Sequence, residues 1–351
     1  MKKILALLLA AVLVLGMAAC AASPAAPTQT TSDTASDASD TPASNAETPA
    51  ASSGAKLRFV TGGESGTYYA FGSVIAQHAT NNAGIDVVGL VGNGSQSNIF
   101  ELEDGNAELA FCQSDVMAYA YAGTNLFADT GAVSCFSTVA ALYTEQVQIV
   151  TIDPEIKTVA DLKGKNVSIG AAGSGVYFNA VDILSAYGLG DLDAEGKFTK
   201  INATYQSFGD SADSLKDGKI DAAFTVAGAP TTAIVDYATT NTLNLVSLSD
   251  EELAAIQEAY PFLIRDDLAA GTYTGQDADV TCVAIQATLV ASEELSEDVV
   301  YEFVKAMFDN KDALTEGHAK FGFLDPEAAS AGATVTMHPG AEKYYKEIGV
   351  L

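Results

Sequence analysis

The stretch KLRFVTGGESGTYYAFGSVIA, residues 56–76, decides the fold class. It starts with a short apolar run, continues through a turn of Gly and Ser, and ends in a segment with apolar residues at helical spacing. We therefore expect a strand in KLRFVTG and a helix from Thr67 to about Asn81. A small-residue turn between a strand and a helix exposes backbone N–H groups at the helix N-terminus, where anions bind.

The same order of strand, small-residue turn and helix recurs along the chain. GNGSQSN (92–98) and GAAGSGVYF (170–178) again separate a strand-like run from a helical one. Further strands are expected in CFSTVAALY and EQVQIVTI, taken as two strands, and in DVTCVAIQATLVAS (279–292). Strands that alternate with helices favour an α/β fold with parallel sheets.

The strand and helix units fall into two sets, one before Thr151 and one between Asn166 and Leu248. The late strand and the helical run after it would return the chain to the first set, so that two crossing strands form a hinge. This organisation predicts two lobes. Lobe 1 would hold residues 56–149 and 279–351, and lobe 2 residues 150–278.

The beginning of the chain has the features of an exported lipoprotein. Residues 1–19 have the basic start, apolar middle and small-residue end of a secretory signal. Cys20 stands where a bacterial lipoprotein carries its lipid, so we expect cleavage before Cys20 and anchoring to a membrane; an ordinary signal peptide with an incidental Cys is the alternative. Residues 21–55 contain no Val, Ile, Leu, Met or aromatic residue, which predicts a disordered tether across 20–55.

The composition argues against several classes of protein. A formal net charge of −28 disfavours nucleic acid as a partner, because nucleic acid requires a basic surface. The three histidines show no metal-ligand spacing, and neither a metal nor a cofactor is expected. Cys112, Cys135 and Cys282 lie in strand-like runs without C-x-x-C spacing, so we interpret them as small apolar residues, and a disulfide between two of them is left open.

Nucleotide-binding and hydrolase motifs are incomplete. A phosphate loop needs Gly-Lys followed by Ser or Thr, and no Lys lies in any of the three turns. GNGSQS has Ser97 where the dinucleotide fingerprint needs its last Gly. The G-x-S-x-G elbow of serine hydrolases does not occur in the sequence. We therefore expect no enzyme activity.

The three turns together predict a cleft for a small anion or zwitterion, because ligands of open α/β sheets lie at the carboxyl ends of strands. Gln113 offers a donor and an acceptor, and Asp115 would either take a ligand ammonium or cap the following helix. The only two arginines, Arg58 and Arg265, lie outside the turns. A ligand carboxylate would then depend on backbone N–H groups, hydroxyls and helix ends rather than on an arginine.

Several long motifs resemble those of the TAXI family, the extracytoplasmic solute receptors of TRAP (tripartite ATP-independent periplasmic) transporters. They include TGGESGTYYAFGSVIA, GNGSQSNIFELEDGNAELAFCQSDVMAYAYAG, DLKGKNVSIGAAGSGV and GKIDAAFTVAGAPT, and the resemblance runs from about Lys56 to Phe308. It implies a two-lobed periplasmic-binding-protein fold, type II-like, that closes on a glutamate-like amino acid or small carboxylate. It also implies delivery of that ligand to a membrane-embedded TRAP permease.

The resemblance places the ligand contacts at the strand-end turns. Tyr143, in ALYTEQ, would lie near the hinge, and Val176 stands where many relatives have a Thr, which removes one hydroxyl. The implied ligand-binding residues are Ser65, Gly66, Thr67, Tyr68, Ser95, Asn98, Gln113, Ser114, Asp115, Tyr143, Ser174, Gly175, Gly228 and Pro230.

Two alternatives accompany this interpretation. The same fold would suit the substrate-binding lipoprotein of an ABC importer, which differs in its membrane partner. A secreted enzyme or an adhesion lipoprotein is the third hypothesis. For the leading hypothesis we expect a protein exported through a signal peptide and held by Cys20 at the outer face of the cell membrane.

Overall fold

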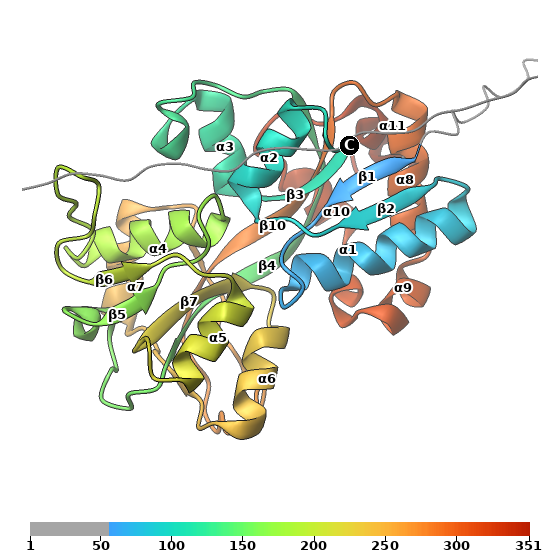
Figure 1. Ribbon diagram of the computed structural model, residues 1–351. Coiled ribbons are helices and arrows are strands. Elements are labelled where there is room, and N and C mark those ends of the chain that lie inside the picture. The colour runs from blue at the N-terminus through green and yellow to red at the C-terminus, as the bar shows by residue number, and fades with distance from the viewer. Residues whose placement is uncertain (1–55) are drawn as a thin grey trace, which may run out of the picture. The chain divides into compact units, whose positions relative to one another are not determined.

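A single mixed sheet runs through the computed structural model, which describes residues 56–351 (Figure 1). The strand order is β2-β1-β3-β10-β4-β7-β5-β6, with β8 added to β4 and β9 to β10. The predicted signal segment, Cys20 and tether lie outside the described residues. The strands are β1 (Leu57–Val60), β2 (Val87–Leu90), β3 (Leu109–Gln113), β4 (Phe136–Thr151), β5 (Asn166–Ser168), β6 (Asn202–Thr204), β7 (Ala222–Ala227), β8 (Asn244–Leu245), β9 (Ile264–Arg265) and β10 (Val283–Ser292).

Helices lie around both ends of the sheet (Figure 1). Their starts follow ordinary capping chemistry; the hydroxyl of Ser249 accepts from the backbone N–H of Glu252, whose carboxylate accepts from Ser249 N in return. The helices are α1 (Thr67–His78), α2 (Ser95–Glu103), α3 (Ser114–Ala122), α4 (Gly175–Ala186), α5 (Phe208–Lys216), α6 (Thr232–Thr240), α7 (Asp250–Ala259), α8 (Glu297–Asp309), α9 (Lys311–Gly317), α10 (Pro326–Ala331) and α11 (Pro339–Glu347), with short 3-10 turns at Val159–Leu162 and Ala319–Phe323.

The sheet has two parallel halves joined by antiparallel strands. Strands β2, β1 and β3 pair in parallel, and so do β7, β5 and β6. Strands β10 and β4 pair antiparallel to each other, and each also pairs with one half, β10 with β3 and β4 with β7. We call the β1–β3 half, with α1–α3 and α8–α11, the first lobe and the β5–β7 half, with α4–α7, the second lobe. The two-lobed α/β fold predicted from the sequence is confirmed.

The two long strands belong to both lobes. In β4, Val139 and Leu142 pack in the core of the first lobe, whereas Val147 and Ile149 pack in that of the second. In β10, Leu289 packs in the core of the first lobe and Ile285 in that of the second. The strands therefore cross between lobes near residues 143–145 and 285–287. The predicted residue boundaries of the lobes, at 149/150 and 278/279, stay a prediction.

The expectation of two separate strands in CFSTVAALY and EQVQIVTI is wrong, because Phe136–Thr151 is one strand of 16 residues. Thr144 joins the two runs, and a β-branched residue continues a strand where Gly, Pro or Asn would end it. The register between β4 and β10 shifts between Gln286 and Thr288, which lie opposite Thr144 and Ala141. A bulge of this kind bends a long strand, and here it lies at the crossing.

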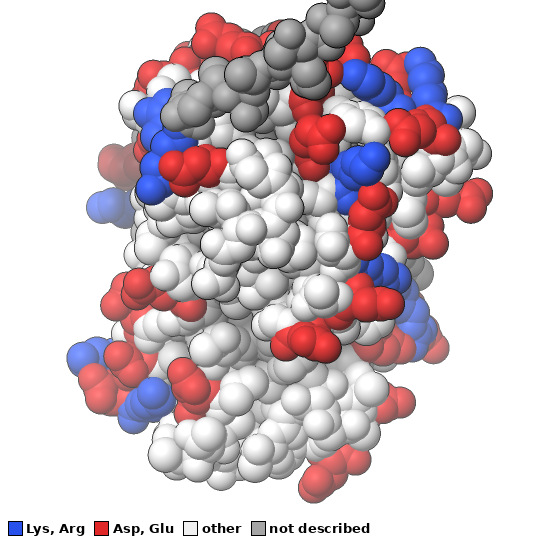
Figure 2. Space-filling view, turned by 90° about the vertical axis from the view of Figure 1, so that its right-hand side faces the viewer, with Lys and Arg blue, Asp and Glu red and all other residues white. Residues whose placement is uncertain are grey.

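Charged side chains of both signs are mixed on one face of the molecule. On the face shown in Figure 2, basic residues lie among acidic ones near the edges, and the middle is largely uncharged. None of the helices between residues 56 and 351 has both the length and the apolar character that crossing a membrane requires.

The three cysteines of residues 56–351 are free thiols, and they are Cys112 and Cys282, which are buried, and Cys135, which is half-buried. The disulfide left open by the sequence does not form in this structure.

Candidate ligand-binding site

A cavity of about 300 Å³ lies where the turns of the two lobes meet. This volume falls at the lower end of the range that small-molecule sites occupy, about 300–1,000 Å³. Its wall comes from short segments at strand ends, together with one residue of β4, Glu145. The lining residues are Gly62, Gly63, Glu64, Ser65, Gly66, Thr67, Tyr68, Val91, Gly92, Asn93, Gly94, Ser95, Gln113, Glu145, Ala171, Ser174, Gly175, Val176, Gln206, Ser207, Phe208, Gly209, Val226 and Ala227.

Four helices begin at this wall, namely α1, α2, α4 and α5. Each N-terminus presents backbone N–H groups and the positive end of the helix dipole. The helices of the first lobe follow Gly66 and Gly94 and have no capping side chain. Those of the second lobe follow Ser174 and Ser207, whose hydroxyls accept from backbone N–H groups of their own first turns. Aligned N–H groups at helix ends of this kind stabilise a negative charge.

The turns of the first lobe are held by Asn98, one of the predicted ligand contacts. Its side-chain amide donates to the carbonyl oxygens of Thr61 (2.6 Å) and Phe111 (2.9 Å), which ties α2 to the ends of β1 and β3. Gly92 passes so close that a Cβ there would lie 2.5 Å from Asn98 Oδ1. The glycine is needed for this approach. Asn98 itself does not line the cavity.

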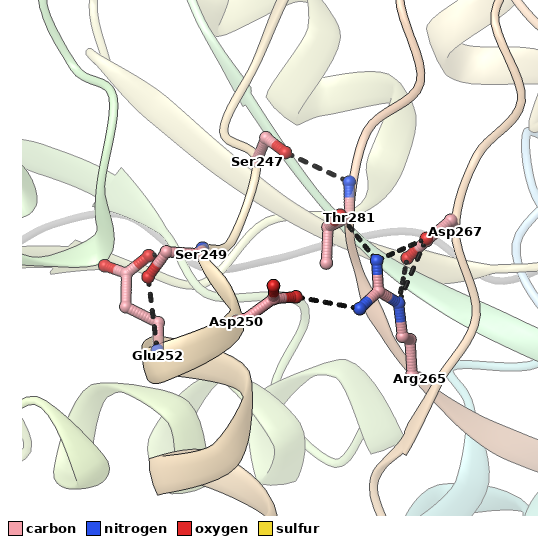
Figure 3. Close-up of polar contacts among 7 residues, drawn as sticks. All are labelled: Ser247, Ser249, Asp250, Glu252, Arg265, Asp267 and Thr281. Atoms are coloured by element: carbon pink, nitrogen blue, oxygen red, sulfur yellow. Dashed lines mark hydrogen bonds and ion pairs between the residues drawn. The ribbon is translucent and has the colours of Figure 1, made fainter.

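No arginine, lysine or histidine of residues 56–351 lines the cavity. The guanidinium of Arg58 forms an ion pair with Glu108. Arg265 pairs with Asp267 and Asp250, and it also donates to Thr281 (Figure 3). Both arginines are thus engaged in surface ion pairs. Neither arginine lines the cavity, whereas the expected dependence of a ligand carboxylate on helix ends and hydroxyls stays a prediction.

Glu145 is the one buried carboxyl in the wall among the described residues. It comes from β4 at the point where the strand crosses between lobes, and it is 2% exposed. The hydroxyl of Tyr68 donates to Glu145 Oε2 at 2.7 Å. Burial, more than any neighbouring charge, raises the pKa of Glu145 to about 8. The carboxyl is therefore largely protonated at neutral pH while the site holds no cation.

The two lobes touch each other directly around the cavity. The backbone N–H of Ser97 donates to Gly173 O (3.0 Å), and the hydroxyl of Thr67 donates to Gly228 O (2.7 Å). At Gly175 a Cβ would lie only 2.0 Å from Gln113 Oε1, so the start of α4 sits tightly against the first lobe. The arrangement corresponds to a closed cleft.

A second seam between the lobes contains two more buried carboxyls. Asn179 of α4 donates through its side-chain amide to Asp115 Oδ2 of α3 at 2.9 Å. Asp182, one turn further along α4, has a buried Oδ2 with no hydrogen-bond partner among residues 56–351. Burial raises the pKa of Asp115 to about 6; burial and, secondly, the charge of Asp115 raise the pKa of Asp182 to about 7. Asp115 thus faces the opposite lobe and not the cavity.

The structure brings together eight of the fourteen residues predicted for the site. The other six lie outside the cavity wall, and the role of each of the fourteen in binding stays a prediction. Lining the wall are Ser65, Gly66, Thr67, Tyr68, Ser95, Gln113, Ser174 and Gly175, whereas Asn98, Ser114, Asp115, Tyr143, Gly228 and Pro230 do not line it.

Three of the residues outside the wall lie near the crossing of the lobes. The ring of Tyr143 packs beside Gly228, and its buried hydroxyl has no hydrogen-bond partner within residues 56–351. Gly228 contributes its carbonyl to Thr67, and Pro230 follows a cis peptide bond. Further along the first lobe, Ser114 begins α3 and its carbonyl accepts from Thr334.

Sequence reasoning missed Glu145 and the start of α5. Glu145 lies two residues after Tyr143 in ALYTEQ, but a carboxylate inside a predicted strand gives no sign that it faces a ligand. The segment from Gln206 to Gly209 follows strand β6, which is the same strand-to-helix pattern as the three turns. This segment contains a single glycine, so it was not recognised as a turn of the same kind.

No group of three or more His, Cys, Asp or Glu side chains suited to a metal occurs within residues 56–351.

Comparison with known proteins shows what the chain is similar to. The family described as NMT1-like matches residues 59–349. Among solved structures, the periplasmic aliphatic sulphonate binding protein SsuA from Escherichia coli shares 15% identity over 83% of this chain and 82% of its own, with a TM-score of 0.42. A putative L-cystine ABC transporter protein from Listeria monocytogenes shares 14% identity over 76% of this chain and 95% of its own, with a TM-score of 0.47. A likeness at this level says nothing about what this chain binds.

Proposed function

The chain belongs to the NMT1-like family, and on that premise we propose that it is an extracytoplasmic solute receptor. It binds a small carboxylate or amino acid between its lobes and delivers it to a membrane permease. The observation that carries this proposal is the ring of four helix N-termini around a cavity without a cationic side chain in the described residues. A carboxylate fits such a wall, because aligned N–H groups and helix dipoles stabilise a negative charge.

The crossing strands support a receptor that opens and closes. Strands β4 and β10 are continuous between the lobes, so a small change in their bend would separate the two walls of the cavity. The contacts from Ser97 to Gly173 and from Thr67 to Gly228 would then break. Ligand enters the open form and is enclosed by closure, and the closed form is the one a permease would recognise.

The proposal assigns no chemistry to the protein. No histidine or cysteine of residues 56–351 lines the cavity, so a nucleophile with a neighbouring imidazole base is missing from its wall. Glu145 is held by the hydroxyl of Tyr68. The polar groups of the wall are suited to holding a ligand and do not form a nucleophile and base pair.

The membrane partner is proposed from the sequence. The motifs shared with TAXI receptors favour a TRAP permease, and Cys20 with the tether behind it would hold the receptor beside that permease. A substrate-binding lipoprotein of an ABC importer would use the same cavity. The two hypotheses separate in a pull-down from membranes with the lipidated chain: a multi-spanning permease without an ATPase supports TRAP, and an ATPase subunit supports ABC.

The binding proposal is tested by thermal shift. The chain from Cys20 onward, with Cys20→Ser to prevent lipidation, is screened against amino acids, dicarboxylates and keto acids. A ligand at about 100 times its Kd adds roughly 2.7 kcal/mol to the folded state. At roughly 2–4 °C per kcal/mol, a Tm rise of about 5 °C or more is expected. A flat screen together with unchanged small-angle scattering in every ligand would contradict the proposal.

A further inference from the structure

We propose that Glu145 receives the ammonium group of the ligand, so that the solute is an amino acid or another small zwitterion rather than a dicarboxylate. This inference depends on the receptor function proposed above, because it assigns one end of the ligand in the same cavity. The wall offers donors at the helix N-termini and acceptors at Glu145 and Gln113.

Glu145 is placed to meet a cation. Its carboxyl lines the cavity although the residue is 2% exposed, and Tyr68 fixes it by donating to Oε2. Within residues 56–351 it forms no ion pair with a basic side chain at 4 Å or less. A buried carboxylate without a counter-ion is costly, so the empty site keeps a proton on Glu145, and an arriving ammonium would be the partner that lets this carboxyl ionise.

A second acceptor lies in the same wall. Gln113 is 2% exposed, and its Oε1 has no hydrogen-bond partner among the described residues. An ammonium carries three N–H donors and no acceptor, so it can donate to Glu145 and to Gln113 together. A hydroxyl carries a single donor, and a second carboxylate at neutral pH carries none. The pair of acceptors therefore selects for an ammonium.

The groups that face Glu145 come from several elements. Tyr68 is on α1, Asp115 is in the first turn of α3, and Tyr143 is on β4 itself. Gln113, at the end of β3, also hydrogen-bonds to Glu145 through its side chain. Lys320, in the 3-10 turn Ala319–Phe323, is the cation whose charge favours the ionised form. Its ammonium lies 5.7 Å from the centre of the Tyr143 ring and 5.4 Å from that of Phe323, without ion-pair contact to Glu145.

The protonation state of Glu145 should change when the ligand binds, and this change can be measured. Because burial raises the pKa of Glu145 to about 8, the empty site holds a proton on this carboxyl at pH 7. An ammonium stabilises the ionised carboxylate, so its binding lowers that pKa and releases the proton to solvent. A dicarboxylate or a hydroxy acid would leave the proton in place. Affinity for an amino acid should rise between pH 6 and pH 8, and affinity for its hydroxy analogue should not.

The test is isothermal titration of the chain from Cys20 with Cys20→Ser. L-Glutamate, L-glutamine, L-alanine and L-leucine are each compared with the matching 2-hydroxy acid, at pH 7 in phosphate and in Tris. The difference in observed enthalpy between the two buffers gives the number of protons released. We expect one amino acid to bind at least about tenfold more tightly than its hydroxy analogue, with release of close to one proton.

Glu145→Gln removes both the preference and the proton release, whereas Glu302→Gln is the matched control. Glu302 lies on α8, is exposed and does not line the cavity, so its variant should keep both. Equal binding of the amino acid and the hydroxy acid, or binding without proton release in the unmodified chain, overturns the role of Glu145 and leaves the receptor function standing. An absence of binding by all members of the panel and by dicarboxylates contradicts the receptor function itself.

Discussion

The helices that the two lobes turn toward the cavity begin in different ways. In the first lobe, α1 and α2 follow Gly66 and Gly94 without a capping side chain. In the second lobe, α4 and α5 follow Ser174 and Ser207, whose hydroxyls already accept from backbone N–H groups. Helix ends that lack an internal cap favour an external anion. We therefore expect the first lobe to contribute more to anion binding, and the second lobe, whose helix ends already have an internal cap, to contribute mainly through closure.

The largest effect is expected from Gly175→Ala, which adds one methyl group where the lobes meet. The new Cβ would lie 2.0 Å from Gln113 Oε1 and 2.7 Å from Ser95 Oγ in the closed form. Alanine is a good helix residue, so the open form is not destabilised. Overpacking of this kind costs about 1–3 kcal/mol, which predicts a loss of roughly 10- to 100-fold in affinity by isothermal titration.

Gly209→Ala is the matched control for that substitution. Gly209 also lies at the start of a second-lobe helix that lines the cavity, but the nearest atom to a Cβ there would be Ser65 Oγ at 3.2 Å, a contact that a small shift relieves. Its affinity should stay within about threefold of the unmodified chain. If both variants bind equally well, α4 does not pack against the first lobe in the ligand-bound state, and the assigned division of labour fails.

The next effect concerns the seam outside the cavity and is a pH dependence of stability. The pKa of Asp182 is raised to about 7 in the folded chain, above its ordinary value of 3.8. A raised pKa means that the folded state holds the proton more tightly, so the stabilisation is complete below pH 4 and is lost as the pH rises through 7. Burial and, secondly, the charge of Asp182 also raise the pKa values of Tyr119 and Tyr260.

Asp182→Asn mimics the protonated carboxyl at every pH. We expect it to raise the free energy of unfolding at pH 8 by roughly 1–3 kcal/mol and to change it little at pH 4. Urea unfolding at the two pH values measures both. An equal change at both pH values would show that the carboxyl ionises without penalty in the folded chain, which contradicts its burial between the lobes.

The smallest effect is expected from Ser207→Ala, which removes the cap of α5. Loss of a serine cap costs about 0.5–2 kcal/mol of stability. Because the hydroxyl serves its own helix, ligand affinity should change little, and urea unfolding without ligand should register the loss. Unchanged stability together with a large loss of affinity would mean that this hydroxyl serves the ligand, which would make the two lobes alike.

The sequence was most informative at the turns of glycine and serine that lie between a strand and the following helix. The turns at 62–68, 92–95 and 170–175 could be placed at the site because backbone geometry at a strand end depends on local residues. The two-lobed fold followed from the order of the same units. Such turns can be predicted from the sequence because their own residues determine which backbone N–H groups stay exposed.

Glu145, Asn98 and Asp115 show where this reasoning stopped. Their roles depend on partners distant in sequence: Glu145 bonds to Tyr68, Asn98 to Thr61 and Phe111, and Asp115 to Asn179. Spacing along the chain does not reveal which lobe a carboxylate will face after closure. The sequence placed Asp115 as a possible ammonium acceptor, and the structure presents Glu145 at the cavity in its place.

Small-angle scattering with and without the tightest ligand of the thermal-shift panel tests the central claim most directly. The radius of gyration should fall when the ligand is added to the unmodified chain. In Gly175→Ala this fall should disappear at a ligand concentration well above the Kd measured for the unmodified chain. A ligand that binds to the unmodified chain without any change in the radius of gyration would contradict closure of the two lobes around the cavity.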